Sequence, residues 1–331
     1  TIKLNKISMK KILIIGGGAM GSAFVIPCLE KNNKVTITEP YNKVFIKDLS
    51  SKRKFHSSLR ICLPKMLKFR RYTKNILKEK FDLIVIALSL VGIDFIGNEL
   101  KDTNIKTPIL VLTKGLKYDK KKKKILTISE LLKKKYSVSN ISILKGPCLA
   151  KELAKKKKTS VIVANKNISI AKWIGKQIST KYYLTEFSTD VTGIEICSAI
   201  KNIYAMIIGS GQNLNTSSGL FQKSIIEMKF LTKYFKGDES TILGLAGVGD
   251  LYVSAAGGRN SKMGDYLGKG FTYRFAKKKF MPNDTVEGEQ LAREIGPYIL
   301  RKIDKRKIPL MNNLLKTVLK NKKLKLINKK F

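Results

Sequence analysis

Short apolar runs alternate with helix-length intervals through the first half of the chain. The runs are rich in β-branched residues, and most end at glycine, proline or clusters of lysine and asparagine. Continuous apolar runs of this length are typical of strands that are buried on both faces of a parallel sheet. Such alternation predicts a doubly wound α/β domain. We predict strands at residues 11–15, 34–40, 81–89, 107–115, 141–147, 159–166 and, with a weaker pattern, 182–187.

The pattern changes after about residue 190, where extended runs stop and helical periodicity begins. A chain of 331 residues is too long for one typical core. We therefore predict an α/β domain over residues 1–190 and an all-α domain over residues 191–331. Glycines 257, 258, 264, 268 and 270 indicate a looped region between two helices. The predicted helices are 191–209, 218–235, 239–255, 287–303 and 309–320.

The first apolar run ends in a glycine motif. Gly16, Gly18 and Gly21 match the pattern G-x-G-x-x-G, which here follows a predicted strand and opens a predicted helix at Ala19 and Met20. In a Rossmann-like domain the first glycine makes a tight turn, the second lets a diphosphate approach, and the third lets the helix pack on the sheet. The helix N-terminus then faces the phosphates. The segment predicts a dinucleotide-binding site; the alternative is a glycine turn that binds no nucleotide.

An acidic residue lies at the end of the second predicted strand. Glu39 follows Gly21 at about the spacing at which a carboxylate hydrogen-bonds the adenosine ribose. The same carboxylate would repel a 2′-phosphate, so the sequence favours NAD over NADP. No arginine lies near Glu39, although Lys43 could weaken this preference.

The chain is strongly basic, with 66 Lys and Arg residues, 24 Asp and Glu residues, and a net charge of +42. A charge this large is typical of proteins that bind nucleic acid. However, only nine of the basic residues are arginine, the residue that base and bidentate phosphate recognition favours, and the lysines are spread along the whole chain. We therefore expect no specific nucleic-acid partner, while the positive field would still attract a small anionic substrate.

Other kinds of site are disfavoured by residue counts and spacing. The cysteines at positions 28, 62, 148 and 197 show no paired spacing, which argues against a disulfide framework or a zinc site. His56, the single histidine, lies beside basic residues and is interpreted as an ordinary loop residue. No run approaches the roughly 18 apolar residues of a membrane span, and the apolar stretch 11–15 is too short for a signal peptide. We expect a cytoplasmic protein without a metal or a membrane span.

A lysine lies in the middle of an apolar segment in the second half. Burial of the Lys201 amine would be costly unless another group pairs with it; the alternative is that the side chain reaches the surface.

The chain closely resembles the NAD(P)-dependent glycerol-3-phosphate dehydrogenases over about residues 10–320. The resemblance rests on this lysine segment, the glycine motif and several other stretches, all in family order. The stretches are 112–116, 146–154, 193–209, 244–251, 257–260 and 286–288.

The resemblance implies a fold, a reaction and a catalytic group. It implies a Rossmann domain, a helical substrate domain, and interconversion of dihydroxyacetone phosphate and sn-glycerol 3-phosphate for glycerophospholipid synthesis. Lys201 matches the catalytic lysine of the family, and a lysine whose pKa is lowered by burial can donate a proton and take it back. By resemblance, Lys114 contacts substrate and cofactor and polarises the carbonyl. Asp250 could pair with Lys201; its alternative role is a helix cap.

Further positions match the binding residues of the family. Arg259 and Asn260 match a pair that binds phosphate and bridges to the cofactor, and an arginine can clamp phosphate with two hydrogen bonds. The resemblance also suggests a homodimer. It implies substrate contacts from Gly146, Cys148, Asn202 and Gly258, and cofactor contacts from Ala150, Thr285 and Glu287.

Several positions depart from the family pattern. Cys148 replaces a usual Ser or Thr, and because a thiol is a weaker hydrogen-bond donor we expect lower phosphate affinity. Leu88 replaces a usual proline, Leu149 replaces an aromatic residue, and Gly258 replaces a Ser that bacterial members often carry. Residues 222–224 read Gln-Lys-Ser in place of Thr-Arg-Gly. These changes affect the expected substrate and cofactor preference rather than the type of reaction.

Two other functions stay open. One is a related two-domain dehydrogenase that acts on another small phosphorylated or carboxylated alcohol, which a comparison of substrates would distinguish. The other is a catalytically inactive nucleotide- or nucleic-acid-binding relative. The presence of Lys114, Lys201, Asp250 and Arg259 argues against the second.

Overall fold

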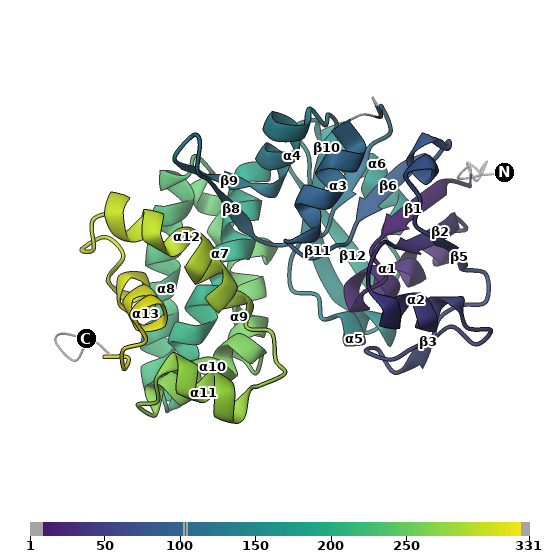
Figure 1. The fold of residues 1–331 in the computed structure, drawn as a ribbon. Helices are drawn as coiled ribbons and strands as arrows, with labels where there is room; N and C mark the ends of the chain where they lie inside the picture. Colours follow the sequence, from purple (N-terminus) through teal and green to yellow (C-terminus); the bar gives the residue numbers. More distant parts are fainter. Residues whose placement is uncertain (1–8, 102, 104, 326–331) are drawn as a thin grey trace. The chain divides into compact units, whose positions relative to one another are not determined.

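The computed structural model describes residues 9–101, 103 and 105–325 (Figure 1). Contacts divide this part of the chain into two compact units. The first unit comprises residues 9–113, 129–144 and 148–189, and the second comprises residues 114–128, 145–147 and 190–325. Two short segments from the first half of the sequence therefore pack in the unit that the second half builds.

The first unit is built on a sheet of eight described strands, in the order β12-β11-β10-β7-β6-β1-β2-β5. The pairs β1–β2, β1–β6, β6–β7, β7–β10, β2–β5 and β11–β12 are parallel. All seven predicted strands are present, and β5 is an additional strand at one edge. The strands are β1 (Lys11–Ile15), β2 (Lys34–Glu39), β5 (Lys68–Arg71), β6 (Leu83–Ile86), β7 (Ile109–Val111), β10 (Ile141–Lys145), β11 (Thr159–Ala164) and β12 (Tyr183–Ser188).

Both faces of this sheet are covered, as the predicted doubly wound fold requires. Ile12 and Ile14 of β1 pack in a core cluster with residues of α1, α5 and α6. Leu13 and Ile15 point to the opposite face and are also fully buried. This two-sided burial explains the continuous apolar runs in the sequence. The helices of the unit are α1 (Ala19–Glu30), α2 (Lys43–Ser50), α3 (Gly92–Lys101), α4 (Ile128–Tyr136), α5 (Ala150–Ala154) and α6 (Ile168–Ile178).

A long helix, α7 (Val191–Gly209), lies at the centre of the second unit (Figure 1). By length and composition it is the one described helix that could cross a membrane, but 94% of its apolar window is buried, as in the core of a globular unit. The predictions for α7 and α13 are confirmed, as is the one for α12 to within one residue, while α8 begins four residues earlier than predicted. The helices around α7 are α8 (Leu214–Tyr234), α9 (Asp250–Ala255), α10 (Arg259–Gly268), α11 (Tyr273–Phe280), α12 (Glu287–Lys302) and α13 (Pro309–Lys320).

The predicted looped region around the glycines between 257 and 270 is wrong, because α10 occupies most of it. A Cβ atom at Gly264 would lie 2.0 Å from the Met206 carbonyl oxygen of α7. This glycine therefore permits close packing of two helices. The helix predicted over 239–255 is also divided, into a 3₁₀ turn (Glu239–Leu243), a π turn (Leu245–Gly249) and α9.

Two hairpins lie outside the predicted strands. In the first unit β3 (Phe55–His56) pairs with β4 (Ile61–Cys62), and in the second unit β8 (Leu116–Asp119) pairs with β9 (Lys124–Thr127). These strands are only two to four residues long, so no extended apolar run indicated them.

A buried carboxylate joins three helices of the second unit. Glu227 of α8 accepts hydrogen bonds from the backbone N–H groups of Leu310 (2.6 Å) and Met311 (3.0 Å) at the start of α13, and from the Tyr204 hydroxyl of α7 (2.9 Å). Burial raises the pKa of the Glu227 carboxyl to about 7, because the loss of hydration outweighs these three hydrogen bonds. The residue therefore couples helix packing to protonation.

We expect Glu227 to make the stability of the fold depend on pH. A carboxyl whose pKa is higher in the folded chain stabilises the fold fully below about pH 4.5 and loses that contribution as the pH rises through about 7. Glu227→Gln cannot titrate, so its free energy of unfolding relative to the wild type should rise by about 2–3 kcal/mol across this interval. Chemical denaturation of both proteins measures the difference, and two parallel stability curves would contradict the prediction.

Candidate active site

The glycine motif forms the turn between β1 and α1 in the first unit. Gly16 has a φ of +119°, which side chains rarely adopt, and a Cβ atom there would lie 2.5 Å from the Ala87 carbonyl oxygen. A Cβ atom at Gly21 would lie 2.0 Å from the Gly16 carbonyl oxygen. Glycine is therefore required both for the turn and for the close start of the helix.

The N-terminus of α1 suits a diphosphate. Gly18 is the N-cap residue before Ala19 and Met20, and no side chain in the described residues caps the helix. A Cβ atom at Gly18 would meet only the Phe45 ring, at 3.6 Å, so the backbone here is open to a ligand. The first N–H groups of a helix lack intrahelical partners and favour anions. These residues fit the diphosphate of a nicotinamide dinucleotide.

Glu39 holds this turn from the end of β2. The side chain is buried, and its Oε2 atom accepts a hydrogen bond from the Gly17 N–H at 2.6 Å. Its Oε1 atom accepts from the N–H groups of Tyr41 (3.2 Å) and Asn42 (3.0 Å). Glu39 thus fixes the backbone of the glycine turn and of the residues that follow β2. The contact of Glu39 with the adenosine ribose stays a prediction.

An arginine does lie near Glu39, so the expectation that none does is wrong. The parallel register of β2 and β5 pairs Glu39 with Arg71. The two residues are distant in the sequence, and β5 reads Lys-Phe-Arg-Arg, so no apolar run revealed the strand that brings the arginine there.

His56 is not an ordinary loop residue, because it lies in β3 and is fully buried. Its ring stacks on Phe45 with the centroids 5.2 Å apart. The Leu59 N–H donates to Nδ1 at 3.3 Å, which leaves the proton on Nε2 to donate to the Gly17 carbonyl oxygen at 2.9 Å. Glu39 and His56 therefore hold the N–H and the carbonyl group of Gly17 respectively.

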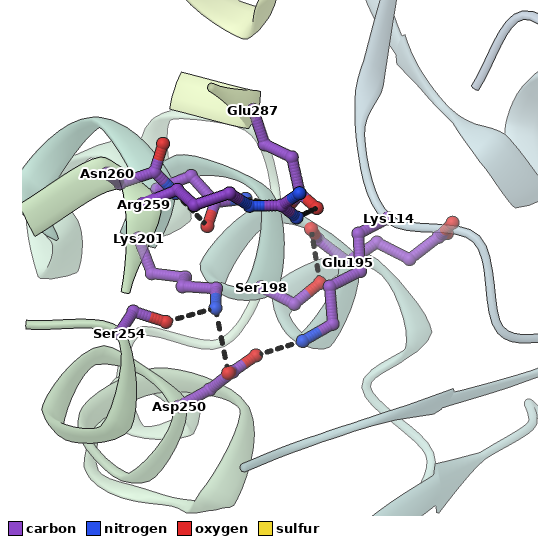
Figure 2. A network of polar contacts seen from close by, with 10 residues as sticks. Lys114, Glu195, Ser198, Lys201, Asp250, Ser254, Arg259, Asn260 and Glu287 are labelled. Carbon is purple, nitrogen blue, oxygen red and sulfur yellow. Dashed lines mark hydrogen bonds and ion pairs between the residues drawn. The ribbon is translucent and has the colours of Figure 1, made fainter. Parts of the chain in front are cut away.

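Two lysines share one buried carboxylate in the second unit (Figure 2). Asp250 Oδ2 lies 2.5 Å from Nζ of Lys114, and Asp250 Oδ1 lies 2.8 Å from Nζ of Lys201. The side chains of Asp250 and Lys201 are 4% and 7% exposed. The structure thus places the Lys201 amine in the interior, paired with Asp250, rather than at the surface.

Three separate elements bring these groups together. Lys201 lies in the middle of α7, and Lys114 lies just before β8. Asp250 is the first residue of α9, directly after the π turn. Gly247 allows that turn, since a Cβ atom there would lie 2.0 Å from the Ile242 carbonyl oxygen.

The environment shifts the pKa values of this group. Burial lowers the pKa of Lys201 and the nearby charge of Lys114 lowers it further, while Asp250 opposes both effects. Burial alone would raise the pKa of Asp250, but the two ammonium groups bring it below its usual value. Asp250 therefore stays ionised at neutral pH, and Lys201 releases a proton more readily than an exposed lysine.

A second set of contacts begins at the next residue of α7. Asn202 donates to Glu287 Oε2 at 3.2 Å and accepts from the Asn260 side chain at 3.0 Å. Asn260 Oδ1 in turn accepts from the Gly288 N–H at 2.9 Å. Arg259 forms an ion pair with Glu287 at 3.8 Å, and its side chain is 54% exposed. The amides are therefore fixed, while the guanidinium group is accessible to an anion.

The remaining predicted site residues lie in both units. In the second unit, Gly146 follows β10 with a φ of +125°, Gly258 is the N-cap of α10, and Thr285 is exposed just before α12. In the first unit, Cys148 and Ala150 are half-buried at the start of α5. Among the departures from the family pattern, Leu88 is buried and Leu149 is exposed.

Two polar residues of the second unit were not predicted from the sequence. Ser254 accepts a hydrogen bond from the Lys201 amine and lies one helical turn after Asp250. Lys145 ends β10 and is almost fully buried. Burial lowers the pKa of Lys145 to about 7, with Glu195 opposing this shift and Lys114 adding to it. In the sequence, the feature that could have identified Lys145 is the position of a charged residue at the end of an apolar run.

The parallel sheet with its glycine turn, and the buried lysine–carboxylate group of the helical unit, define a nicotinamide-nucleotide-dependent dehydrogenase. Family models for the N-terminus and the C-terminus of NAD-dependent glycerol-3-phosphate dehydrogenase match residues 11–171 and 190–329. The chain belongs to the NAD(P)-dependent glycerol-3-phosphate dehydrogenase family of enzymes.

Individual relatives agree with this assignment. The chain is 28% identical over 312 residues to glycerol-3-phosphate dehydrogenase [NAD(P)+] of Francisella tularensis, which covers 91% of each chain. It is 30% identical over 275 residues to an NADP(+)-dependent glycerol-3-phosphate dehydrogenase of Archaeoglobus fulgidus, covering 79% of this chain and 81% of the relative. The fold is similar to that of glycerol-3-phosphate dehydrogenase from Coxiella burnetii, with a TM-score of 0.80, 22% identity, and coverage of 95% and 96% of the two chains.

The two contacts of His56 can be tested separately. In His56→Gln the amide nitrogen can take the place of Nε2, whereas in His56→Asn the side chain reaches only the position of Nδ1. We expect the Asn variant to weaken NADH binding about three- to tenfold, the usual effect of one lost buried hydrogen bond. The Gln variant should bind nearly as the wild type does. Fluorescence titration with NADH measures both, and equal affinities of the two variants would contradict the prediction.

Proposed function

We propose that this chain interconverts dihydroxyacetone phosphate and sn-glycerol 3-phosphate with NAD(P)H, and that this reaction supplies glycerophospholipid synthesis in the cytoplasm. The observation that carries the proposal is the buried group of Lys114, Asp250 and Lys201. Membership of the family supports the reaction, and the resemblance suggests that the enzyme acts as a homodimer.

The cofactor would be held mainly by the first unit. Gly16, Gly18 and the first turn of α1 at Ala19, Met20 and Gly21 suit the diphosphate, and Glu39 lies where the adenosine ribose is expected. Ala150, Thr285 and Glu287 are proposed as further cofactor contacts by resemblance. When bound, the reduced nicotinamide supplies the hydride for C2 of the ketone.

The chain's own residues would handle the proton. Lys201, held by Asp250 and Ser254, would donate a proton to the oxygen on C2 and accept it in the reverse direction. Lys114 would polarise the same oxygen. Because both ammonium groups are fixed by one ionised carboxylate, their positions are set before substrate binds, which reduces the reorganisation that the reaction requires.

The phosphate of the substrate would be bound by Arg259 and Asn260, with Asn202 orienting the substrate. The accessible guanidinium can donate two parallel hydrogen bonds to phosphate oxygens. Gly146, Cys148 and Gly258 are proposed as additional contacts by resemblance. The thiol of Cys148 would contribute less to phosphate binding than the usual hydroxyl.

Lys201→Ala tests this mechanism directly. We expect turnover of dihydroxyacetone phosphate to fall about a hundred- to ten-thousandfold, the usual contribution of a general acid, with NADH affinity within about twofold of the wild type. Lys229→Ala, which removes an exposed lysine of α8, is the matched control and should change neither quantity. NADH absorbance measures turnover, and fluorescence titration measures affinity.

Two results would overturn the assignment. A folded Lys201→Ala variant that retains turnover, or that loses NADH binding, would exclude the role of Lys201 as a proton donor. A wild-type enzyme that ignores dihydroxyacetone phosphate but reduces another small phosphorylated or carboxylated ketone would favour the related dehydrogenase.

A further inference from the structure

Lys145 is a buried lysine that the mechanism proposed above does not use. It is the last residue of β10, and only 2% of its surface is exposed. β10 pairs in parallel with β7, and Lys114 follows the end of β7. The carboxyl ends of parallel strands meet at the same edge of a sheet. The fold therefore brings Lys145 and Lys114 to neighbouring positions along this edge.

The segment that carries Lys145 packs against the turn that carries Asp250. Residues 145–147 belong to the second unit, as does α9, which begins at Asp250. A Cβ atom at Gly249, the residue before Asp250, would lie 3.6 Å from the Cγ atom of Pro147, an ordinary van der Waals contact. Lys145 is therefore held near the carboxylate that the two lysines of the active site share.

Charged groups of three elements act on the Lys145 amine. They are Glu195 of α7, Lys114 before β8 and Asp250 of α9. Burial lowers the pKa of Lys145 to about 7; the charge of Glu195 opposes this shift, Lys114 adds to it, and Asp250 opposes it. Glu195 is itself only 1% exposed, and Figure 2 includes it in the polar network of the site. The charge on Lys145 therefore changes near neutral pH, where Lys114 and Asp250 experience the change.

We propose that Lys145 is a positioning residue for reduction of the ketone, whose ammonium charge acts through Lys114 and Asp250 to stabilise the negative charge that develops on the substrate oxygen. The side chain is almost fully buried, so it acts through these neighbours rather than by contact with substrate. Its charge attracts Asp250 and thereby offsets part of the charge with which Asp250 neutralises Lys114 and Lys201. A fixed charge has most effect where water is excluded and where charge develops in the transition state. The proposal rests on the reaction proposed above and adds a residue to it.

Lys145→Met tests this role, because methionine has a similar shape and no charge. The measurement is kcat/KM for dihydroxyacetone phosphate at saturating NADH, which reports the protonation of the enzyme before it binds the ketone. We expect the ratio of wild type to variant to be about three- to tenfold at about pH 6 and to fall to about one at about pH 8.5, because a group with a pKa of about 7 loses its proton across this range. Taking the ratio cancels the titration of the substrate phosphate. A ratio that does not change with pH would show a merely structural role and would overturn the proposal.

Further variants provide the controls. Lys229→Met makes the same substitution at an exposed lysine of α8, and its ratio to the wild type should stay near one at every pH. Lys145→Arg keeps its charge throughout this range, so at high pH it should retain the rate advantage that the wild type has lost. An arginine variant that behaves as the methionine variant does at every pH would contradict a role for the charge. If Lys145→Met does not fold, the double variant Lys145→Met/Glu195→Gln takes its place, since it leaves no buried carboxylate without its partner.

Carbon-13 NMR of lysine-labelled protein separates a failure of this proposal from a failure of the proposed function. If the wild type turns over no dihydroxyacetone phosphate, the proposed function fails, but the titration of Lys145 can still be followed. Exposed lysines titrate near a pH of about 10.4, so a signal that titrates near about 7 and is absent from Lys145→Met identifies Lys145. The Lys114 signal, assigned with Lys114→Met, should shift as Lys145 titrates in the wild type and should not shift in Lys145→Met. A Lys114 signal that does not respond in the wild type would overturn the proposal.

Discussion

The second unit depends on one buried carboxylate that faces two ammonium groups. Asp250 compensates Lys114 and Lys201, which come from a segment before a hairpin and from the central helix. Removal of one partner of a buried pair usually costs about 3–5 kcal/mol, because it leaves a charge without compensation. This constraint explains why residues 114–128 pack with the helices of the second half: the lysine at the start of that segment has its partner there.

The first unit likewise uses buried polar side chains, here to hold its glycine turn. The backbone N–H and carbonyl groups of Gly17 are bound by Glu39 and His56, which lie on different strands. Glycine gives a turn the conformation that a diphosphate needs, but it also leaves the backbone free to move. Two buried side chains remove that freedom, so the turn is preorganised without adding bulk where the ligand would approach.

Elements that are buried on both faces have apolar sequences and could be predicted. Elements without a long apolar run were missed. The strands buried on both faces were found as continuous runs, whereas β5 is mostly polar and the hairpin strands are very short, so both were missed. The glycine at position 264 was interpreted as part of a loop although it serves close packing against α7. Among the site residues, Lys201 and Asp250 were predicted through a motif. His56 binds the backbone of Gly17, and Arg71 lies opposite Glu39 in the sheet. Both pairs are distant in the sequence, and only the fold brings them together.

Lysines are so frequent in this chain that their positions in the sequence do not distinguish the functional ones. Partners and burial do distinguish them. A lysine that transfers a proton benefits from burial, which lowers its pKa, and then needs a carboxylate to hold it, as Asp250 holds Lys201. A cation that is to bind phosphate must instead stay accessible to solvent, as Arg259 does with a side chain that is 54% exposed. The two kinds of environment therefore assign opposite tasks to similar side chains.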